Sequence, residues 1–578
     1  SAPRVLLLVL SVSLLVIPAA AQRSRAPQQQ PAQAAPAVIN LPEPGQQALA
    51  AVRKEAIRAH TRFLSSDGLE GRGTGQRGGD IAGDYIATQF ALAGLQPAGE
   101  NGSYLQRVPM VGISTDPSSK VTFLPTSGAP MEMRMAEDIV AMDETQNAAS
   151  EVDAELVFVG YGIEAPEYNW DDYKGLDVRG KVLLMLVNEP PSQDPNFFKG
   201  PALTYYGRWT YKYEQAARKG ALGAVLIHRT DMASYGWDVV KNSWGGERSY
   251  LKVENAPKLK LASWVQFEIA RQLAVASSQD LEQLMTQARS RDFRPITLNV
   301  RVRSLVASKI RPFDSNNVLA LLPGSDPNLR GQAVLYSAHY DHLGVHPDQK
   351  GDNIYNGAVD NATGTAMLLE IAHAYTRASS APARSILFAA VTGEEQGLLG
   401  SLYLGEHPPV PAGSITLGLN FDGLAPLGVP QEVELVGSER TTFYPTVQNT
   451  AREFRLEIKP DSNPGAGFYY RSDHFSFARV GVPAFSVNQG MQFQGHPAEW
   501  GVQQEREYNE KRYHQPSDQF QEEWDFSGLS ELSRFGIALG WRAATQPELI
   551  GWQPGDEFEA ARHSRQMAPT GQPTPGVQ

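Results

Sequence analysis

The sequence predicts an α/β protein built on a mostly parallel sheet with helices on both faces. Between residues 307 and 546, short apolar runs alternate with longer segments that fit helices. Strands are expected at 333–337, 385–391, 414–420 and 482–487, and a helix at 363–376. Such alternation is typical of parallel strands that are buried on both faces and joined by helices.

Two further blocks precede this region, as expected for a chain of 578 residues, which is too long for one ordinary domain. The first, 46–150, contains helical patterns at 48–64 and 80–95 on either side of a Gly-rich turn. The second, 151–306, has apolar runs that fit strands at 155–160, 181–187 and 223–227, and a helix at 211–219.

The ends of the chain differ from these blocks in composition. A basic Arg4, an apolar run over 5–17 and small residues up to Ala21 indicate a secretory signal peptide over 1–21. A single-pass anchor is the alternative, but the run is shorter than the roughly 20 apolar residues that a span needs. Residues 22–45, rich in Gln, Pro and Ala, are expected to be a disordered linker, and 547–578 a flexible tail.

The overall composition excludes several classes of function. The sequence has no cysteine, which rules out disulfides, thiolate metal ligands and a cysteine nucleophile. The net charge of −12, with no Lys- or Arg-rich run, argues against nucleic acid as a partner. Together with the signal peptide, these features predict an exported protein of bacterial type, periplasmic or secreted, with no stable membrane span after signal cleavage.

Side chains that can bind metal follow three of the predicted strands. In chain order they are His339 and Asp341, then Glu394 and Glu395, then Asp422. Because the carboxyl ends of parallel strands open into one crevice, these residues are expected to converge. Asp360, just before the helix at 363–376, and His514 complete the candidate set.

The residue types point to zinc. Imidazole and carboxylate ligands suit Zn²⁺ when thiolates are absent, although Mn²⁺ or Co²⁺ accept the same atoms. Three ligating carboxylates and one hydroxide balance the charge of two Zn²⁺ ions. Taken singly, each residue has an ordinary alternative: a helix cap for Asp360, a turn for Asp341, a solvated pair for Glu394 and Glu395, a surface histidine for His514.

In their order and spacing, these motifs resemble the co-catalytic zinc aminopeptidases related to bacterial leucyl aminopeptidase, aminopeptidase Y and glutamate carboxypeptidase II. The resemblance covers about 307–546 and extends back to Gly-Leu-Glu-Gly-Arg-Gly at 68–73. Residues 151–306 look like a protease-associated (PA) domain, from the runs at 180–184 and 216–225. The resemblance implies a three-layer αβα zinc-exopeptidase fold with a smaller, β-rich α/β PA insertion.

The resemblance also implies two Zn²⁺ ions and a role for each ligand. His339 and Asp422 would bind one ion, Glu395 and His514 the other, and Asp360 would bridge them. The implied activity is hydrolysis of peptide bonds in peptide substrates, most of all as an aminopeptidase that releases N-terminal residues.

Three further residues have implied roles at this centre. Glu394 would be the general base, and Asp341 would orient His339. Tyr469, in the run Tyr469-Tyr-Arg-Ser-Asp-His474, would donate to the developing oxyanion, with a packing aromatic as the alternative. The resemblance implies no role for His342, His474 and His496, which are interpreted as supporting or structural.

Other functions remain as alternatives on the same fold. A zinc carboxypeptidase would need a basic cluster for the substrate carboxylate, to which Arg471 or Arg479 could contribute. A glutaminyl cyclase-like acyl transferase would use a single zinc. A receptor-like scaffold without metal is disfavoured, because every ligand position of the motif set is filled.

Overall fold

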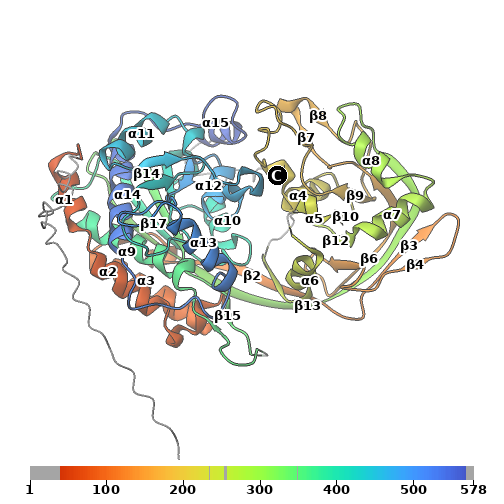
Figure 1. Cartoon of the computed structure of the whole chain (residues 1–578), viewed down its shortest axis with the longest axis horizontal. Helices are drawn as coiled ribbons and strands as arrows, with labels where there is room; N and C mark the ends of the chain where they lie inside the picture. Colours follow the sequence, from red (N-terminus) through yellow and green to blue (C-terminus); the bar gives the residue numbers. More distant parts are fainter. Residues whose placement is uncertain (1–38, 234, 253–256, 348, 568–578) are drawn as a thin grey trace, which may run out of the picture. The chain divides into compact units, whose positions relative to one another are not determined.

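The computed structural model describes residues 39–233, 235–252, 257–347 and 349–567. The predicted signal peptide, the linker up to residue 38 and the tail from residue 568 lie outside these residues. Within the described ranges, no helix combines the length and apolar character needed to cross a membrane. We call residues 39–115 and 308–567 the main lobe, and residues 116–307 the inserted lobe (Figure 1).

The main lobe is built on a sheet in the order β21-β18-β14-β17-β13. Its strands are β13 (Ile296–Leu322), β14 (Ala333–His339), β17 (Ser385–Val391), β18 (Ile415–Asn420) and β21 (Ala484–Ser486). All neighbours in this order are parallel except β13, which is antiparallel to β17. The mostly parallel sheet expected from the sequence is therefore confirmed. In the register, His339 pairs with Val391 and Ser337 with Asn420, so three strands end at the same edge.

Helices cover both faces of this sheet, as the alternating sequence pattern predicts. The main-lobe helices are α1 (Glu43–Ala51), α2 (Lys54–Leu64), α3 (Arg77–Ala93), α9 (Thr363–Thr376), α10 (Leu399–Glu406), α11 (Tyr444–Glu453), α12 (His474–Arg479), α13 (Trp500–Lys511), α14 (Ser527–Thr545) and α15 (Glu559–Met567). On one face, α9 and α14 pack through the stacked rings of Tyr375 and Trp541. In the sheet, Tyr336 of β14 stacks on Phe388 of β17.

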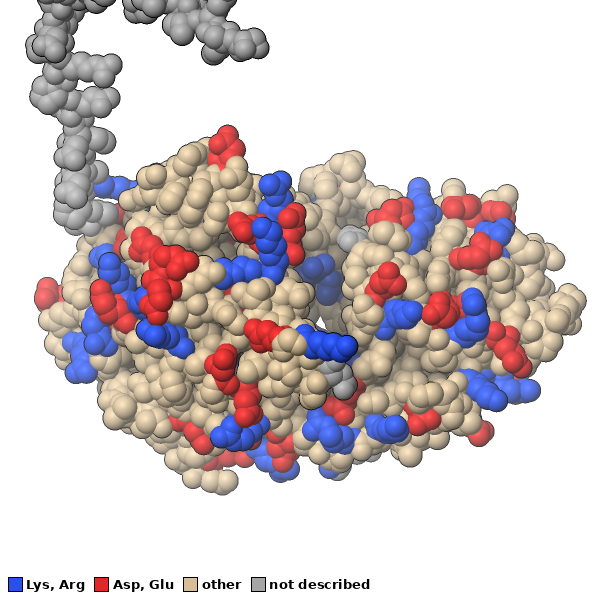
Figure 2. Space-filling view, turned by 60° about the horizontal axis from the view of Figure 1, so that its bottom comes forward, with Lys and Arg blue, Asp and Glu red and all other residues tan. Residues whose placement is uncertain are grey.

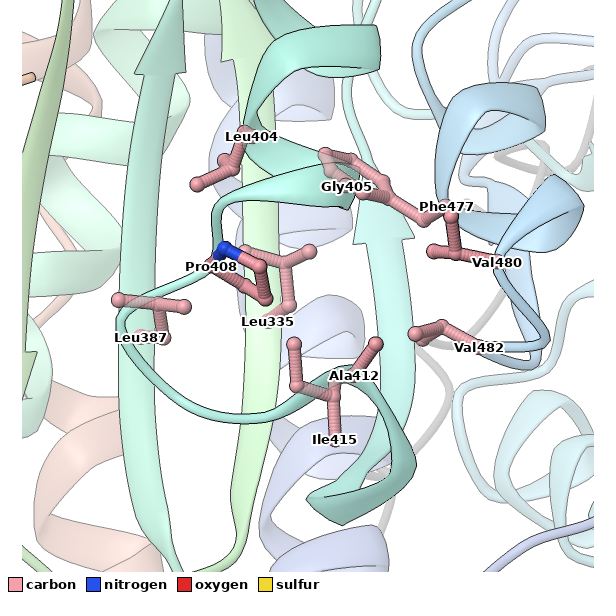
Figure 3. A pocket seen from close by; sticks show the side chains of 10 residues that line it. All are labelled: Leu335, Leu387, Leu404, Gly405, Pro408, Ala412, Ile415, Phe477, Val480 and Val482. Atoms are coloured by element: carbon pink, nitrogen blue, oxygen red, sulfur yellow. The ribbon is translucent and has the colours of Figure 1, made fainter. Parts of the chain in front are cut away.

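On the opposite face, α10 and α12 pack against β14, β17 and β18. Figure 3 shows the ten residues that meet there, and all of them are apolar. Leu335 and Leu387 come from the sheet, Leu404 from α10 and Phe477 from α12. This space is part of the hydrophobic core. With no polar side chain at its wall it cannot support chemistry, and the functional site lies elsewhere.

The inserted lobe has its own sheet, in the order β6-β9-β10-β12-β5, joined to the main sheet through β13. The strands of this sheet are β3 (Lys120–Pro125), β5 (Ile139–Met142), β6 (Ala149–Phe158), β9 (Val182–Leu186), β10 (Gly223–His228) and β12 (Leu261–Gln266). The strand β11 (Arg248–Leu251) pairs with β2 (Leu105–Thr115) of the main lobe instead. The helices of the inserted lobe are α4 (Trp209–Arg218), α5 (Thr230–Ala233), α6 (Trp237–Gly245), α7 (Phe267–Ala276) and α8 (Leu281–Gln287). Helices α4 and α6 pack on one face, α7 and α8 on the other.

The inserted lobe begins earlier than the boundary at residue 151 that we expected. Strand β3 pairs with the first half of β13, and β5 pairs with β12. Both strands lie in the block 46–150 that the sequence placed in the main lobe. The reason is β13, which runs without interruption through both lobes and pairs with β2 (Leu105–Thr115) only in its second half. Sequence periodicity gives no sign of a strand shared in this way.

The described parts of the two ends are more ordered than expected. Helix α1 starts at Glu43, inside the predicted linker, and α1 and α2 are separate because Val52 and Arg53 have extended backbone angles. In the predicted tail, Trp552 and Phe558 are buried in an aromatic cluster and the segment ends in α15. The scattered Pro and Gly of the segment conceal these long-range contacts. Residues 547–567 are therefore a packed segment of the main lobe.

Candidate metal centre

Six of the predicted site residues converge at the carboxyl edge of the main sheet. The first group is formed by His339, Asp360 and Asp422, which are close enough to hold one cation. The His339 Nε2 atom lies 3.1 Å from Asp422 Oδ1 and 3.3 Å from Asp360 Oδ1. His339 ends β14 and Asp422 follows β18, so the strand register itself brings the two together.

A second group uses the other oxygen of Asp360. The His514 Nε2 atom lies 3.2 Å from Asp360 Oδ2 and 3.1 Å from Glu395 Oε2. His342, which had no predicted role, also lines this group: its Nδ1 is 2.6 Å from Glu395 Oε1 and 4.0 Å from Asp360 Oδ2. Asp360 thus has one oxygen in each group, and the two groups share one carboxylate.

Asp360 is held in place by its backbone. The N–H groups of Val359 and Asp360 donate to the carboxylate of Asp518, at 3.1 Å for Asp360. The Asn361 side chain donates to the carbonyls of His339 and Phe421 at 3.2 and 2.9 Å. These contacts tie the turn before α9 to the ends of β14 and β18, which fixes the shared carboxylate between the two groups.

His514 reaches the centre from the loop that follows α13. Its backbone is in the left-handed region, with φ of 55°, and its ring stacks on Tyr513 at 4.0 Å between centroids. The side chain of His514 is 36% exposed, whereas that of His339 is 1% exposed. The centre is therefore closed on the His339 side and open to solvent on the His514 side.

The contacts of the Asp341 carboxylate do not match its expected role, which was to orient the His339 ring. Its carboxylate Oδ1 lies 3.8 Å from His339 Nδ1, beyond hydrogen-bond length, while the main-chain oxygen of Asp341 lies 3.2 Å from that nitrogen. The carboxylate instead accepts hydrogen bonds from the backbone of Glu394 and Glu395 and from the hydroxyl of Thr74, at 2.9 Å for Thr74. It therefore fixes the turn that carries the two glutamates.

Glu394 lies in this turn, half-buried beside the other acidic groups. Burial raises the pKa of Glu394 well above its usual range, and the charges of Asp422 and Glu395 raise it further, against the lowering effect of His339. A carboxyl group in such a place takes up a proton more readily than one in water. This property suits a group that must accept a proton during a reaction.

For the two imidazoles of the centre, neighbouring carboxylates raise the pKa and burial lowers it. Burial lowers the pKa of His514, but hydrogen bonds to Asp360 and Glu395 outweigh it and raise the pKa to about 10. Burial also opposes the charge of His339, yet Asp422 and Glu394 hold its pKa well above the usual value. The raised pKa values favour the protonated imidazoles in the metal-free protein, so a cation that binds there competes with protons.

The structure contradicts the oxyanion role suggested for Tyr469. This side chain is buried, with its ring near Tyr470 and Phe558, and its hydroxyl donates to the carbonyl of Ala484 at 3.0 Å. The guanidinium of Arg440 lies 4.5 Å from the ring centroid. Tyr469 is therefore the packing aromatic that the sequence left as the alternative, because its neighbours belong to the C-terminal segment.

Sequence reasoning missed several residues that support the centre. Arg72 is fully buried and donates to the carbonyls of Tyr340 at 2.7 Å, Asn356 at 2.6 Å and Gly357 at 2.8 Å. Burial lowers its pKa to about 10. Arg72 thereby braces the loops that carry His339 and Asp360. The run that contains Arg72 was the only signal that could have found it.

The donor set fits a pair of divalent cations. In each group, the Nε2 atom of His339 or His514 lies 3.1–3.3 Å from two carboxylate oxygens, as expected for ligands about 2 Å from one ion. Among the described residues, His342 Nε2 is buried without a hydrogen-bond partner, whereas its Nδ1 contacts Glu395. Nitrogen and oxygen ligands without thiolate are those of zinc, manganese or cobalt sites.

Comparison with known proteins agrees with this centre. Peptidase family M28 matches residues 317–534, a segment that includes every predicted site residue. The resemblance stated from the motifs is thereby confirmed. No comparison bears on the protease-associated domain expected at 151–306.

Similar proteins cover the chain only in part. Leupeptin-inactivating enzyme 1 of Streptomyces exfoliatus is 26% identical over 254 residues, 42% of this chain and 51% of that protein. A probable zinc metalloprotease of Pyrenophora teres f. teres is 39% identical over 120 residues, 19% of this chain and 23% of that protein. The chain thus spans about half the length of the first relative and less of the second. The solved aminopeptidase of Aneurinibacillus sp. strain AM-1 is 18% identical, with a TM-score of 0.48, over 89% of this chain and 98% of that chain.

Proposed function

We propose that this protein is a dinuclear zinc metallopeptidase that hydrolyses peptide bonds, and that it acts as an aminopeptidase. One observation carries the proposal: Asp360 has one carboxylate oxygen 3.3 Å from His339 and the other 3.2 Å from His514. A single carboxylate shared by two imidazole–carboxylate groups is what two neighbouring cations require. The name of the Pyrenophora relative, a probable zinc metalloprotease, supports the choice of metal.

The residues divide the work of holding the cations. His339 and Asp422 would hold one ion, His514 and Glu395 the other, and Asp360 both. His342 would hold Glu395 in place, because its Nδ1 contacts the oxygen of Glu395 that His514 does not. When bound, such ions supply Lewis acidity that polarises a carbonyl group and lowers the pKa of water.

The proton transfers of hydrolysis fall to Glu394. Its carboxylate would take a proton from the attacking water and deliver it to the nitrogen of the leaving amine. The backbone contacts of Asp341 hold the turn of Glu394 and Glu395, so the base keeps a fixed position relative to the ligands. No hydroxyl donor to the oxyanion is proposed, since Tyr469 is occupied by Ala484.

The negative charge of the site favours binding of the amino end of a peptide substrate. The free ammonium group of a peptide would lie against the carboxylates of Asp360, Asp422 and Glu394, which attract a cation. We further propose that residues 1–21 direct export and that the inserted lobe is a PA domain, both on sequence grounds.

A substitution of Glu394 tests the function. We expect Glu394→Ala to retain both metal ions and to lose about 10²–10⁴-fold in turnover of aminoacyl p-nitroanilides. Glu523→Ala removes the same charge from an exposed position of the main lobe and serves as the control. Loss of metal from Glu394→Ala would make Glu394 a ligand, and unchanged turnover would refute its role as the base.

The choice of substrates separates the competing enzyme classes. An aminopeptidase cleaves peptides with a free N-terminus and spares their N-acetylated forms. A carboxypeptidase cleaves N-acetylated peptides from the other end, and a glutaminyl cyclase converts N-terminal glutamine with release of ammonia. Cleavage of the acetylated peptides at rates equal to the free ones would contradict the aminopeptidase assignment.

A further inference from the structure

The imidazole of His342 is fully buried and makes a single hydrogen bond within the described part of the chain. Its Nδ1 atom lies 2.6 Å from Glu395 Oε1, while its Nε2 atom is buried without a partner. Because an ionised carboxylate can only accept, the hydrogen of the ring that faces Glu395 stands on Nδ1 and is donated. A buried nitrogen without a partner destabilises a protein, and an apolar side chain of similar shape would avoid it. The donor at Nδ1 is therefore the property that distinguishes histidine at this position.

Two loops hold the His342 ring against Glu395. Gly357, with φ of 55°, lies so close that a Cβ atom there would come within 2.5 Å of the His342 ring. Arg72 joins the two loops, since its carbonyl accepts the N–H of His342 at 3.2 Å and its guanidinium donates to the carbonyl of Gly357 at 2.8 Å. The ring is therefore closely packed, with Nδ1 toward Glu395.

This contact divides the two oxygens of Glu395 between two partners. Oε1 accepts the hydrogen bond of His342, and Oε2 lies 3.1 Å from His514 Nε2. His342 Nδ1 is 4.0 Å from Asp360 Oδ2, which is too far for a hydrogen bond, so its one hydrogen goes to Glu395. Of the two oxygens of Glu395, Oε2 is thus the one that faces a cation beside His514.

Asp422, the other carboxylate that faces a single cation position, is divided in the same way. Its Oδ1 lies 3.1 Å from His339 Nε2, and its Oδ2 accepts the hydroxyl hydrogen of Ser472 at 2.5 Å. Asp360 differs, since one of its oxygens lies 3.3 Å from His339 Nε2 and the other 3.2 Å from His514 Nε2. Each cation position therefore has three protein atoms: one imidazole nitrogen, one oxygen of Asp422 or Glu395, and one oxygen of Asp360.

The partners of these carboxylates differ from those of acidic groups on the surface. On the face drawn in Figure 2, Lys and Arg side chains are interspersed with Asp and Glu. At the centre, Glu395 and Asp422 instead receive an imidazole and a hydroxyl donor, from His342 and Ser472. Such donors satisfy one oxygen without placing the permanent positive charge of a lysine or arginine beside a cation.

We propose that His342 is a positioning residue that keeps Glu395 a monodentate ligand of the cation beside His514, and so leaves a coordination position of that cation open. This inference rests on the proposed metallopeptidase function and adds a positioning residue to it. Catalytic zinc sites combine three protein ligands with one open position, which water or substrate takes. If Glu395 turned both oxygens to the cation, a fourth protein atom would fill that position.

The matched variants His342→Asn and His342→Leu test this role. The two new side chains have nearly the same shape, but the amide keeps a donor at the position of Nδ1 and leucine has none. Cobalt-substituted protein gives one readout, because the visible absorption of Co²⁺ weakens as its coordination number rises. We expect His342→Leu to weaken this absorption and to lower the preference for zinc over manganese about 10-fold, since Mn²⁺ favours more oxygen ligands. His342→Asn should match the unaltered protein, as should the control His228→Leu, which removes a buried imidazole of the inserted lobe.

The outcomes separate this inference from the function on which it rests. If His342→Leu keeps the absorption and the zinc preference, or if His342→Asn changes them equally, the positioning role is refuted and the peptidase function stands. Should circular dichroism show that a variant does not fold, a crystal of the zinc-loaded, unaltered protein decides. Both oxygens of Glu395 at about 2.0–2.2 Å from the ion beside His514 would refute the role, and Oε1 within hydrogen-bond distance of His342 Nδ1 would support it. An unaltered protein that binds no zinc would refute both the role and the proposed function.

Discussion

The shared carboxylate of Asp360 leads to the sharpest prediction. Replacing it by an amide, Asp360→Asn, keeps the shape of the side chain and removes one negative charge from both groups at once. Asp422→Asn removes the same charge from a residue that contacts only one of the two imidazoles, that of His339, at 3.1 Å. The two substitutions thus differ in how many cation positions they touch, which makes each the control of the other.

The expected size of the effect follows from the geometry. Asp360 lies 3.3 and 3.2 Å from the two imidazole nitrogens, so any ion that they bind lies within coordination distance of the carboxylate. At an effective dielectric constant of about 20, a pair of unit charges about 4 Å apart is worth about 4 kcal/mol, so each ion should bind about 10³-fold more weakly.

The assay is the metal content of the purified variants after dialysis against a zinc buffer that saturates the unaltered protein. We expect two ions per chain in the unaltered protein, about one in Asp422→Asn and none in Asp360→Asn. Circular dichroism would show that both variants remain folded. Two retained ions in Asp360→Asn, or a smaller loss there than in Asp422→Asn, would refute the shared-carboxylate geometry.

Three further predictions follow from contacts around the centre. Asp518→Asn, which weakens the hydrogen bonds that hold the backbone of Asp360, should lower turnover or zinc affinity about 10–100-fold; zinc titrations that match the unaltered protein would contradict this. Tyr469→Phe should leave kcat unchanged and lower the free energy of unfolding by about 1–3 kcal/mol, measured in urea, because the carbonyl of Ala484 loses its donor; a 100-fold loss of kcat would restore its catalytic role. Raising the pH should favour zinc binding, because zinc competes with the proton of His514. The pKa of His514 is raised from 6.5 to about 10 in the folded, metal-free protein. The protonated form therefore stabilises the metal-free fold fully below about pH 6.5, and this stabilisation is lost as the pH rises toward 10. Calorimetry at pH 7 in buffers of different ionisation enthalpy should therefore show proton release on zinc binding, and an equal heat in all buffers would count against it.

The sequence was informative where function depends on strand ends. His339, Glu395 and Asp422 each follow a buried apolar run, and the rules for parallel sheets place such residues at one edge. The structure brings them together through the register of β14 with β17 and β18. The roles of these residues remain proposals, but their neighbourhood could be predicted from local pattern alone.

The rest of the centre depends on contacts that no local pattern records. The hydrogen bond of Thr74 with Asp341 spans 267 positions of the chain, and that of Asp518 with Asp360 spans 158. The extent of the inserted lobe was missed for the same reason, because β13 pairs with strands on both sides of the boundary. Tyr469 was misjudged because its partners lie in a segment that reads as a tail.

The most direct test of the account is a count of the ions at Asp360. A crystal of the zinc-loaded protein, measured at the zinc absorption edge, should show two anomalous peaks, one on each side of this carboxylate, within reach of His339 and His514 respectively. A single peak, or two peaks that leave Asp360 outside the coordination of either ion, would contradict it.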